Sequence, residues 1–178
     1  MPVHVLLIRG VNVGGKSVSM PALRAALEER GFEDVTTYRQ SGNVVLRSGR
    51  AADRVAADVR FEIEKAFGFD VAVIARSARQ LAGVVEHNPF LRPDADHGRQ
   101  LLVAFLAARP PAAAVAALDP ARAAPDELSV RGTEVYLWCP NGFGRSKVMD
   151  GVERTLGTAA TVRNWRTTTE LLRMAQDR

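Results

Sequence analysis

The apolar run Val3-His4-Val5-Leu6-Leu7-Ile8 decides how the first part of the chain folds. A run this continuous is typical of a strand that is buried on both faces. A glycine-rich loop follows, after which Ser19 and Pro21 mark the first turn of a helix that ends at Gly31. The chain therefore opens with a strand, a loop and a helix.

Two strands, a helix, a strand and a further helix complete the first half. The two strands are separated by Ser41-Gly42, which predicts a hairpin. The next helix is indicated by apolar residues at intervals of four, and the last one by a capping box. These elements lie at 35–40, 43–47, 55–67, 71–75 and from Ser77 onwards.

The same order restarts after the polar stretch Arg92–Gly98. The second half contains a strand at 101–106, a helix from Pro111 to about Asp119, strands at 128–131 and 134–138, a helix over 148–156, a strand around 161–162 and a helix capped by Thr167-Thr168-Thr169-Glu170. Each half reads βαββαβ plus one helix, so we predict an α+β protein of two tandem ferredoxin-like halves, whose antiparallel sheets are covered by helices. The predicted boundaries are residues 1–90 for the first half, 91–98 for a linker, and 99–178 for the second half with its C-terminal helix.

Composition excludes several classes of protein. Of the 178 residues, 47% are hydrophobic, which excludes wholesale disorder, and no apolar run approaches the roughly eighteen residues of a membrane span. The single cysteine, Cys139, excludes an intrachain disulfide and an all-cysteine zinc site. The N-terminal residues show no signal-peptide pattern, so we expect a cytoplasmic protein that does not enter a membrane.

Charge gives little support for a nucleic-acid partner. The net charge is +4, spread over both halves, and all basic residues except Lys16, Lys65 and Lys147 are arginine. The predicted strands at 3–8 and 43–47 carry no aromatic residue with which an RNA-recognition motif could stack bases. We therefore do not expect nucleic acid to bind.

The first loop that could carry chemistry is Gly10-Val11-Asn12-Val13-Gly14-Gly15-Lys16-Ser17, which follows a strand and matches the phosphate-loop pattern G-x-x-x-x-G-K-[ST]. A nucleotide hydrolase starts its helix at the Gly-Lys-Ser itself, where Pro21 would lie one turn inside the helix and break it. The sequence therefore leaves two interpretations open, an anion-binding loop and a structural glycine turn.

The second loop is Cys139-Pro140-Asn141-Gly142-Phe143-Gly144-Arg145-Ser146-Lys147. Its spacing is similar to the phosphate loop of cysteine-dependent phosphatases, with Cys139 as nucleophile and Arg145 as phosphate clamp. Pro140 removes an amide where that loop needs donors, and cysteine at the end of an apolar strand is usually inert. Anion binding by Arg145 and Lys147 is the other interpretation.

The polar stretch near the middle of the chain offers a third cluster, formed by His87, Asp94, Asp96 and His97. Imidazole and carboxylate groups can hold a divalent metal, but this spacing matches no recurrent ligand pattern. We expect no metal and no cofactor.

Four motifs are spread along the chain: Leu7–Lys16 (LIRGVNVGGK), Tyr38–Val45 (YRQSGNVV), Pro140–Lys147 (PNGFGRSK) and Arg163-Asn164-Trp165. Together they resemble a family of bacterial proteins known only as a domain of unknown function. The resemblance implies two ferredoxin-like halves and implies no reaction or cofactor, since the family has no established activity.

The interpretation that we favour is a protein that binds a small phosphorylated or otherwise anionic ligand near the interface of the two halves. The predicted ligand-binding residues are Arg9, Asn12, Gly14, Gly15, Lys16, Ser41, Asn43, Asn141, Gly142, Gly144, Arg145, Ser146, Lys147 and Asn164. A cysteine-dependent phosphatase that uses Cys139 and Arg145 is one alternative. A protein-interaction module is the other, since exposed sheet edges could pair two copies into a homodimer.

Overall fold

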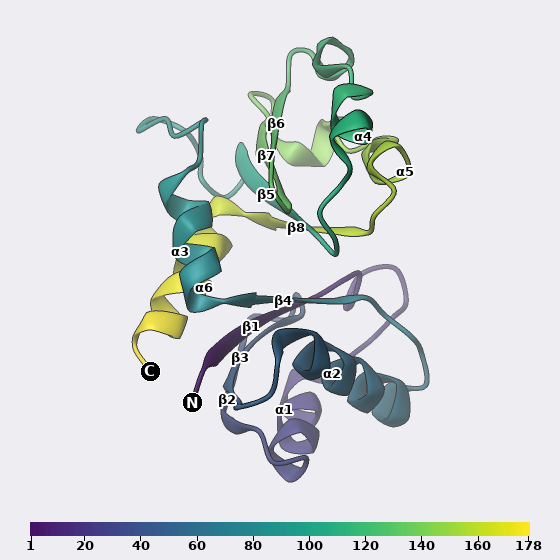
Figure 1. Ribbon diagram of the computed structural model, residues 1–178, viewed down its shortest axis with the longest axis vertical. Coiled ribbons are helices and arrows are strands. Elements are labelled where there is room, and N and C mark those ends of the chain that lie inside the picture. The colour runs from purple at the N-terminus through teal and green to yellow at the C-terminus, as the bar shows by residue number, and fades with distance from the viewer. The chain divides into compact units, whose positions relative to one another are not determined.

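A computed structural model describes residues 1–178 and divides them into two compact units. Unit 1 contains residues 1–83 and 170–178, and unit 2 contains residues 84–169. Each unit is built on a four-stranded antiparallel sheet with helices (Figure 1). The predicted fold class, two tandem ferredoxin-like α+β halves, is confirmed. No helix in the structure combines the length and the apolar character needed to cross a membrane.

Unit 1 has the sheet order β2-β3-β1-β4. The central strands β1 and β3 pair antiparallel with Val5 opposite Val45. The elements that contribute to this unit are β1 (Val3–Ile8), α1 (Met20–Glu29), β2 (Glu33–Tyr38), β3 (Asn43–Arg47), α2 (Ala52–Phe67), β4 (Val73–Ser77) and the first part of α3 (Ala78–Glu86).

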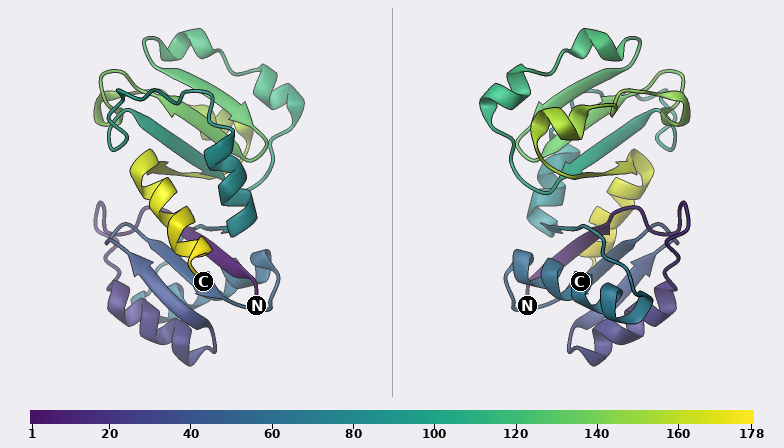
Figure 2. Two further views of the ribbon diagram at one scale, coloured as in Figure 1. Left: turned by 90° about the vertical axis from the view of Figure 1, so that its left-hand side faces the viewer. Right: turned by 90° about the vertical axis from the view of Figure 1, so that its right-hand side faces the viewer.

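The helices α1 and α2 lie side by side on one face of this sheet (Figure 2). Leu6 and Ile8 of β1 are fully buried there in one cluster with apolar residues of α1 and α2. Side chains two residues apart on a strand share a face, so the apolar run of β1 supplies this core with every second residue. Val5 and Leu7, which point to the other face of the strand, are also fully buried, as the continuous apolar run predicts.

Unit 2 repeats this topology with the sheet order β6-β7-β5-β8. Its central strands β5 and β7 pair antiparallel with Leu101 opposite Trp138. The elements are β5 (Leu101–Leu106), α4 (Ala112–Ala116), the 3-10 helix η1 (Pro120–Ala123), β6 (Glu127–Arg131), β7 (Glu134–Trp138), the 3-10 helix η2 (Phe143–Arg145), α5 (Val152–Leu156), β8 (Ala160–Asn164) and the first part of α6 (Trp165–Gln176).

Three helices of the second half differ from the sequence prediction. Helix α5 begins at Val152 rather than Val148, because Gly151 adopts a left-handed conformation with φ 77° that a helix cannot continue through. Helix α6 begins at Trp165, so the capping box predicted at residues 167–170 lies inside the helix, and Oδ1 of Asn164 accepts from the Thr167 amide instead. Helix α4 ends at Ala116, earlier than predicted.

Strand pairing decides which segments lie beside each glycine-rich loop. The end of β1 is bonded to the segment before β4, where the Arg9 amide donates to the carbonyl of Ala72. The end of β7 is bonded to the segment before β5, where the Cys139 amide donates to the carbonyl of Gln100. In topological terms the two loops are not equivalent, since one follows the first strand of its unit and the other follows the third.

Candidate functional site

Loop 2, defined as residues 139–147, is a tight turn that is fixed by its backbone. The Gly142 amide donates to the carbonyl of Cys139, and the Phe143 amide donates across to the carbonyl of Arg99. Gly142 has φ 86°, a conformation that side chains other than glycine rarely adopt. The turn therefore joins the segment before β5 to the loop after β7.

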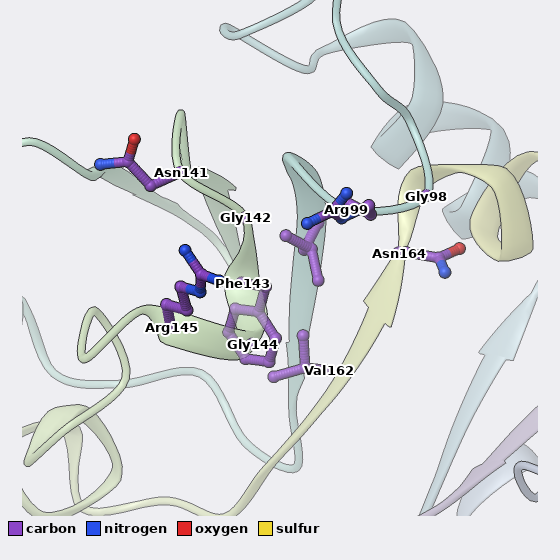
Figure 3. A pocket seen from close by; sticks show the side chains of 10 residues that line it. Gly98, Arg99, Asn141, Gly142, Phe143, Gly144, Arg145, Val162 and Asn164 are labelled. Carbon is purple, nitrogen blue, oxygen red and sulfur yellow. The ribbon is translucent and has the colours of Figure 1, made fainter.

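A pocket of about 550 Å³ lies over this turn (Figure 3). Segments from three strands converge on it: the end of β7, the start of β5, and β8. The lining residues are Gly98, Arg99, Leu102, Asn141, Gly142, Phe143, Gly144, Arg145, Val162 and Asn164.

The rim of the pocket is positively charged. Arg99 and Arg145 are both exposed, and neither guanidinium has an ion pair or a hydrogen bond within the protein. Arg99 lies against Gly142, where an added methyl group would come within 3.7 Å of the arginine Nη2. No carboxylate lines the pocket. This arrangement favours an anion, because charge-assisted bonds from arginine to phosphate or carboxylate oxygens are among the strongest polar contacts.

The floor of the pocket is apolar. Leu102 belongs to the buried core of unit 2, and the half-buried Phe143 and Val162 pack against that core. Figure 3 shows the Phe143 ring beside Val162. The pocket therefore offers two kinds of surface, cationic at its rim and apolar at its floor.

Half of the lining residues were predicted from the sequence as ligand-binding: Asn141, Gly142, Gly144, Arg145 and Asn164. The residues that were not predicted include Arg99, which contributes charge, and Phe143 and Leu102, which contribute apolar surface. The signal for Arg99 was the pairing of β5 with β7, because a residue just before β5 must lie beside the loop that follows β7.

Two other predicted residues of loop 2 are engaged elsewhere. The hydroxyl of Ser146 donates to Asp126 over 2.6 Å and accepts from the Val148 amide, so it fixes the end of the loop. Lys147 lines a different pocket of unit 2, which also contains Asp119 and Asp150. Asn164 lines the loop 2 pocket, but its Oδ1 caps α6 and its amide points away from the two arginines in Figure 3.

Cys139 does not have the environment of a nucleophile. Its side chain is fully buried in the core cluster of unit 2 and does not line the pocket. Burial raises the pKa of its thiol to about 11, and the nearby Asp126 charge acts in the same direction, although a hydrogen-bonding contact with Ser146 opposes them. A thiol that keeps its proton at neutral pH is a poor nucleophile, so the geometry argues against the phosphatase interpretation.

Loop 1, defined as residues 10–17, is bonded to the protein through Asn12. Its Nδ2 donates to the carbonyls of Val18 (3.1 Å) and Gln40 (2.6 Å), and its Oδ1 accepts from the Val18 amide (2.8 Å). The Asn12 amide closes the loop by donating to the carbonyl of Lys16. Helix α1 begins only at Met20, capped by Ser19, so loop 1 does not have the phosphate-loop geometry.

The cation of loop 1 is also bonded within its unit. Lys16 Nζ donates to the carbonyl of Asp70 over 3.1 Å and lies 5.7 Å from the centre of the Phe69 ring. Hydrogen bonds from Arg60 hold the pKa of the Asp70 carboxyl below its usual value, so this carboxylate is charged at neutral pH. Lys16 and Asp70 line one pocket of about 430 Å³ together with Arg9, Gly10, Val13, Gly14, Val71 and Ala72. A carboxylate in the lining makes this pocket less suited to an anion.

The remaining predicted residues of unit 1 have structural contacts. Asn43 is fully buried, and its Nδ2 donates to the hydroxyl of Ser41 and to the carbonyl of Tyr38. These bonds tie the hairpin between β2 and β3. Gly15 has φ 103° at the turn of loop 1 and does not line the pocket.

The histidines and aspartates near the middle of the chain do not gather into a metal site. No three histidine, cysteine, aspartate or glutamate side chains lie where they could hold a metal ion together. Asp96 instead accepts from the Gly98 amide through its Oδ1.

Comparison with known proteins identifies a family but no activity. No curated protein matches the chain. The solved structure of a conserved bacterial protein, SP0830 from Streptococcus pneumoniae, superposes with a TM-score of 0.74 at 20% sequence identity, covering 98% of each chain. At that identity the likeness concerns the fold alone. A family model described as "Protein of unknown function (DUF1697)" matches residues 1–136, which include loop 1 and end before loop 2. Because this match spans more than half of the chain's length, the chain belongs to this family of proteins of unknown function.

Proposed function

We propose that unit 2 binds a small phosphorylated or otherwise anionic ligand in the loop 2 pocket. One observation carries the proposal: Arg99 and Arg145 line the same pocket, and neither is paired with a carboxylate. Elsewhere in the protein, arginines such as Arg30 and Arg60 are paired with acidic side chains. An anion in the pocket would give these two guanidiniums the partners that the chain does not provide.

The proposed activity is binding rather than hydrolysis. The buried Cys139 thiol lies outside the pocket lining, and its raised pKa keeps it protonated. The polar groups of the pocket are asparagine amides, the backbone of its glycines and two arginines. These groups can orient an anion and neutralise its charge, but none of them is a nucleophile.

Inorganic phosphate is the first probe. We expect phosphate to raise the thermal unfolding temperature of the wild type at constant ionic strength, because a ligand at a hundred times its dissociation constant adds about 2.7 kcal/mol of stability. Arg99→Ala and Arg145→Ala should each remove most of this stabilisation. Arg109→Ala is the matched control, because Arg109 is exposed in unit 2 and does not line the pocket.

Two outcomes would contradict the proposal. One is a wild type that phosphate does not stabilise beyond the effect of an equal ionic strength of chloride. The other is a stabilisation that persists in the folded Arg99→Ala, Arg145→Ala double variant. A loss that appears equally in Arg109→Ala would show a general charge effect and would also overturn the pocket as the site.

A further inference from the structure

We infer that the ligand of the loop 2 pocket is an organic phosphomonoester whose uncharged part is apolar or aromatic and lies on the Phe143 ring. This inference rests on the proposed function and specifies the chemistry of the same site. Three properties of the pocket support it: its size, its floor and the number of its charges.

The pocket is larger than a bare anion needs. Its volume of about 550 Å³ lies within the range of about 300–1,000 Å³ that is typical of small-molecule sites. A single phosphate group held by Arg99 and Arg145 at the rim would leave the floor uncovered. The volume therefore indicates that the anion carries an organic group.

The floor indicates what kind of organic group fits. Leu102, Phe143 and Val162 line the pocket with apolar side chains, whereas the exposed Arg99, Asn141 and Arg145 lie at its rim. The Phe143 ring is only half-buried, so one part packs on the core and another part faces the pocket. An apolar or aromatic group would cover this surface favourably, whereas a polyhydroxylated group would lose water contacts there without replacing them.

The two arginines indicate the charge of the anionic group. A phosphomonoester carries a charge of about −1.5 to −2 at pH 7 and presents three terminal oxygens, enough for one guanidinium to bond two of them while the other bonds the third. A carboxylate carries one charge and two oxygens, which a single guanidinium already satisfies. With Arg99 and Arg145 both unpaired and no acidic residue in the lining, the phosphomonoester is the better match.

Calorimetric titration with four simple probes tests the inference: inorganic phosphate, phenyl phosphate, glucose 6-phosphate and benzoate. We expect phenyl phosphate to bind about tenfold more tightly than inorganic phosphate, from the apolar area that it covers. Glucose 6-phosphate should bind no more tightly than phosphate, and benzoate more weakly than phenyl phosphate. In Phe143→Ala the preference for phenyl phosphate over phosphate should fall to about threefold or less.

The outcomes distinguish a failure of the inference about the ligand from a failure of the proposed anion site. Equal binding of phosphate and phenyl phosphate by the wild type overturns the inference and leaves the anion site standing. Equal binding of glucose 6-phosphate and phenyl phosphate, or tighter binding of benzoate, overturns it too. If no probe binds, the proposed function fails with it. Because Phe143 packs on the core, Phe143→Leu provides a second variant that keeps the packing and removes the ring, and an unchanged preference in both folded variants contradicts the inference.

Discussion

Loop 1 and loop 2 have similar sequences and opposite arrangements. Each loop follows a central strand of its sheet and carries a cation close to its last glycine. Loop 1 contains three glycines and loop 2 contains two. In loop 1 the polar groups bond to the protein itself, through Asn12 and through Lys16 at the Asp70 carbonyl. In loop 2 the backbone is bonded, but the guanidinium of Arg145 is left facing a pocket.

A glycine-rich loop with a cation is therefore not by itself an anion site. The side-chain amide of Asn12 lies in the turn of loop 1. It donates and accepts the hydrogen bonds that a bound ligand would have to make with this loop. A charged Asp70 stands beside Lys16, whereas no carboxylate stands beside Arg145. What decides between a structural turn and a binding site is where the unpaired donors are left.

The largest effect that we expect comes from Asn12. Asn12→Ala removes three side-chain hydrogen bonds and places a residue with a methyl side chain at φ 57°, which asparagine tolerates better than alanine. We expect a loss of about 3 kcal/mol in the free energy of unfolding, measured by urea denaturation. Asn12→Gly accepts the backbone conformation and should lose about 2 kcal/mol.

Asn141 is the matched position in loop 2. It is exposed and makes no side-chain hydrogen bond within the protein, so Asn141→Ala should change stability by less than about 0.5 kcal/mol. Equal losses for the two asparagines would mean that both loops are structural, and the contrast between them would disappear.

The next effect concerns the ionisation of Cys139. Burial raises the pKa of the Cys139 thiol to about 11 in the folded protein, whereas a thiol in the unfolded chain has a pKa of about 8.5. The unfolded chain therefore loses this proton first, so stability is fully present below about pH 8.5 and falls as the pH rises toward 11. We expect the wild type to lose on the order of 2 kcal/mol relative to Cys139→Ala between these pH values, measured by urea denaturation at each pH.

The sign of this pH dependence separates the two interpretations of loop 2. The alanine variant is needed because burial also raises the pKa of Tyr136, to about 12, and its titration affects both proteins alike. A nucleophilic Cys139 would have a lowered pKa, and stability would then rise with pH up to the unfolded value. A rise of that kind would restore the phosphatase hypothesis.

Much of the fold could be predicted from the sequence because its signals are local. The continuous apolar run of β1, the cap at Ser19 and the capping box of Ser77 with Gln80 each depend on neighbouring residues, and the structure confirms them. The start of α5 could not be predicted, because the left-handed conformation of Gly151 is not visible in a pattern of apolar residues. The prediction of a helix start fails where the backbone conformation of one residue decides it.

The candidate site could be predicted only in part, because its other half depends on strand pairing. Arg145 lies in a recognisable loop, but Arg99 joins it only through the pairing of β5 with β7. Sequence alone also gave Asn12 and Asn141 the same role, since nothing local says whether an amide bonds inward or faces solvent. Composition identifies a loop, and tertiary contacts decide what its side chains are free to do.

A smaller effect should come from Gln100, which joins the two walls of the loop 2 pocket. Its Nε2 donates to the carbonyl of Pro140 over 2.7 Å, and its Oε1 accepts from the Asp96 amide over 2.8 Å. Gln100→Ala should lower stability by about 1.5 kcal/mol and weaken phosphate binding several-fold, because the segment that bears Arg99 is no longer held against loop 2.

Gln80→Ala provides the matched control for this positioning role. Gln80 also bonds through its side chain, to the Ser77 amide in the capping box, and it lies in unit 1. We expect it to lower stability by about 1 kcal/mol and to leave phosphate binding unchanged. If Gln100→Ala binds phosphate as tightly as the wild type, then Gln100 supports the fold but does not position the binding residues.

The smallest effect on stability separates the glycines of the two loops. Gly14 has φ 62°, so Gly14→Ala should cost about 1 kcal/mol although nothing lies within 4 Å of the new methyl group. Gly144 has no positive φ and equally open space, so Gly144→Ala and Gly144→Val should change the free energy of unfolding by less than about 0.5 kcal/mol.

Phosphate titration then shows what the missing side chain at Gly144 is for. Its position lines the loop 2 pocket, so a valine side chain would occupy space that the anion needs, and Gly144→Val should weaken phosphate binding several-fold in a protein of normal stability. In loop 1 the glycine is required by the backbone; in loop 2 its small size would be required by the ligand. Wild-type phosphate affinity in Gly144→Val would place the anion away from loop 2, and the distinction between the two loops would then rest on Asn12 alone.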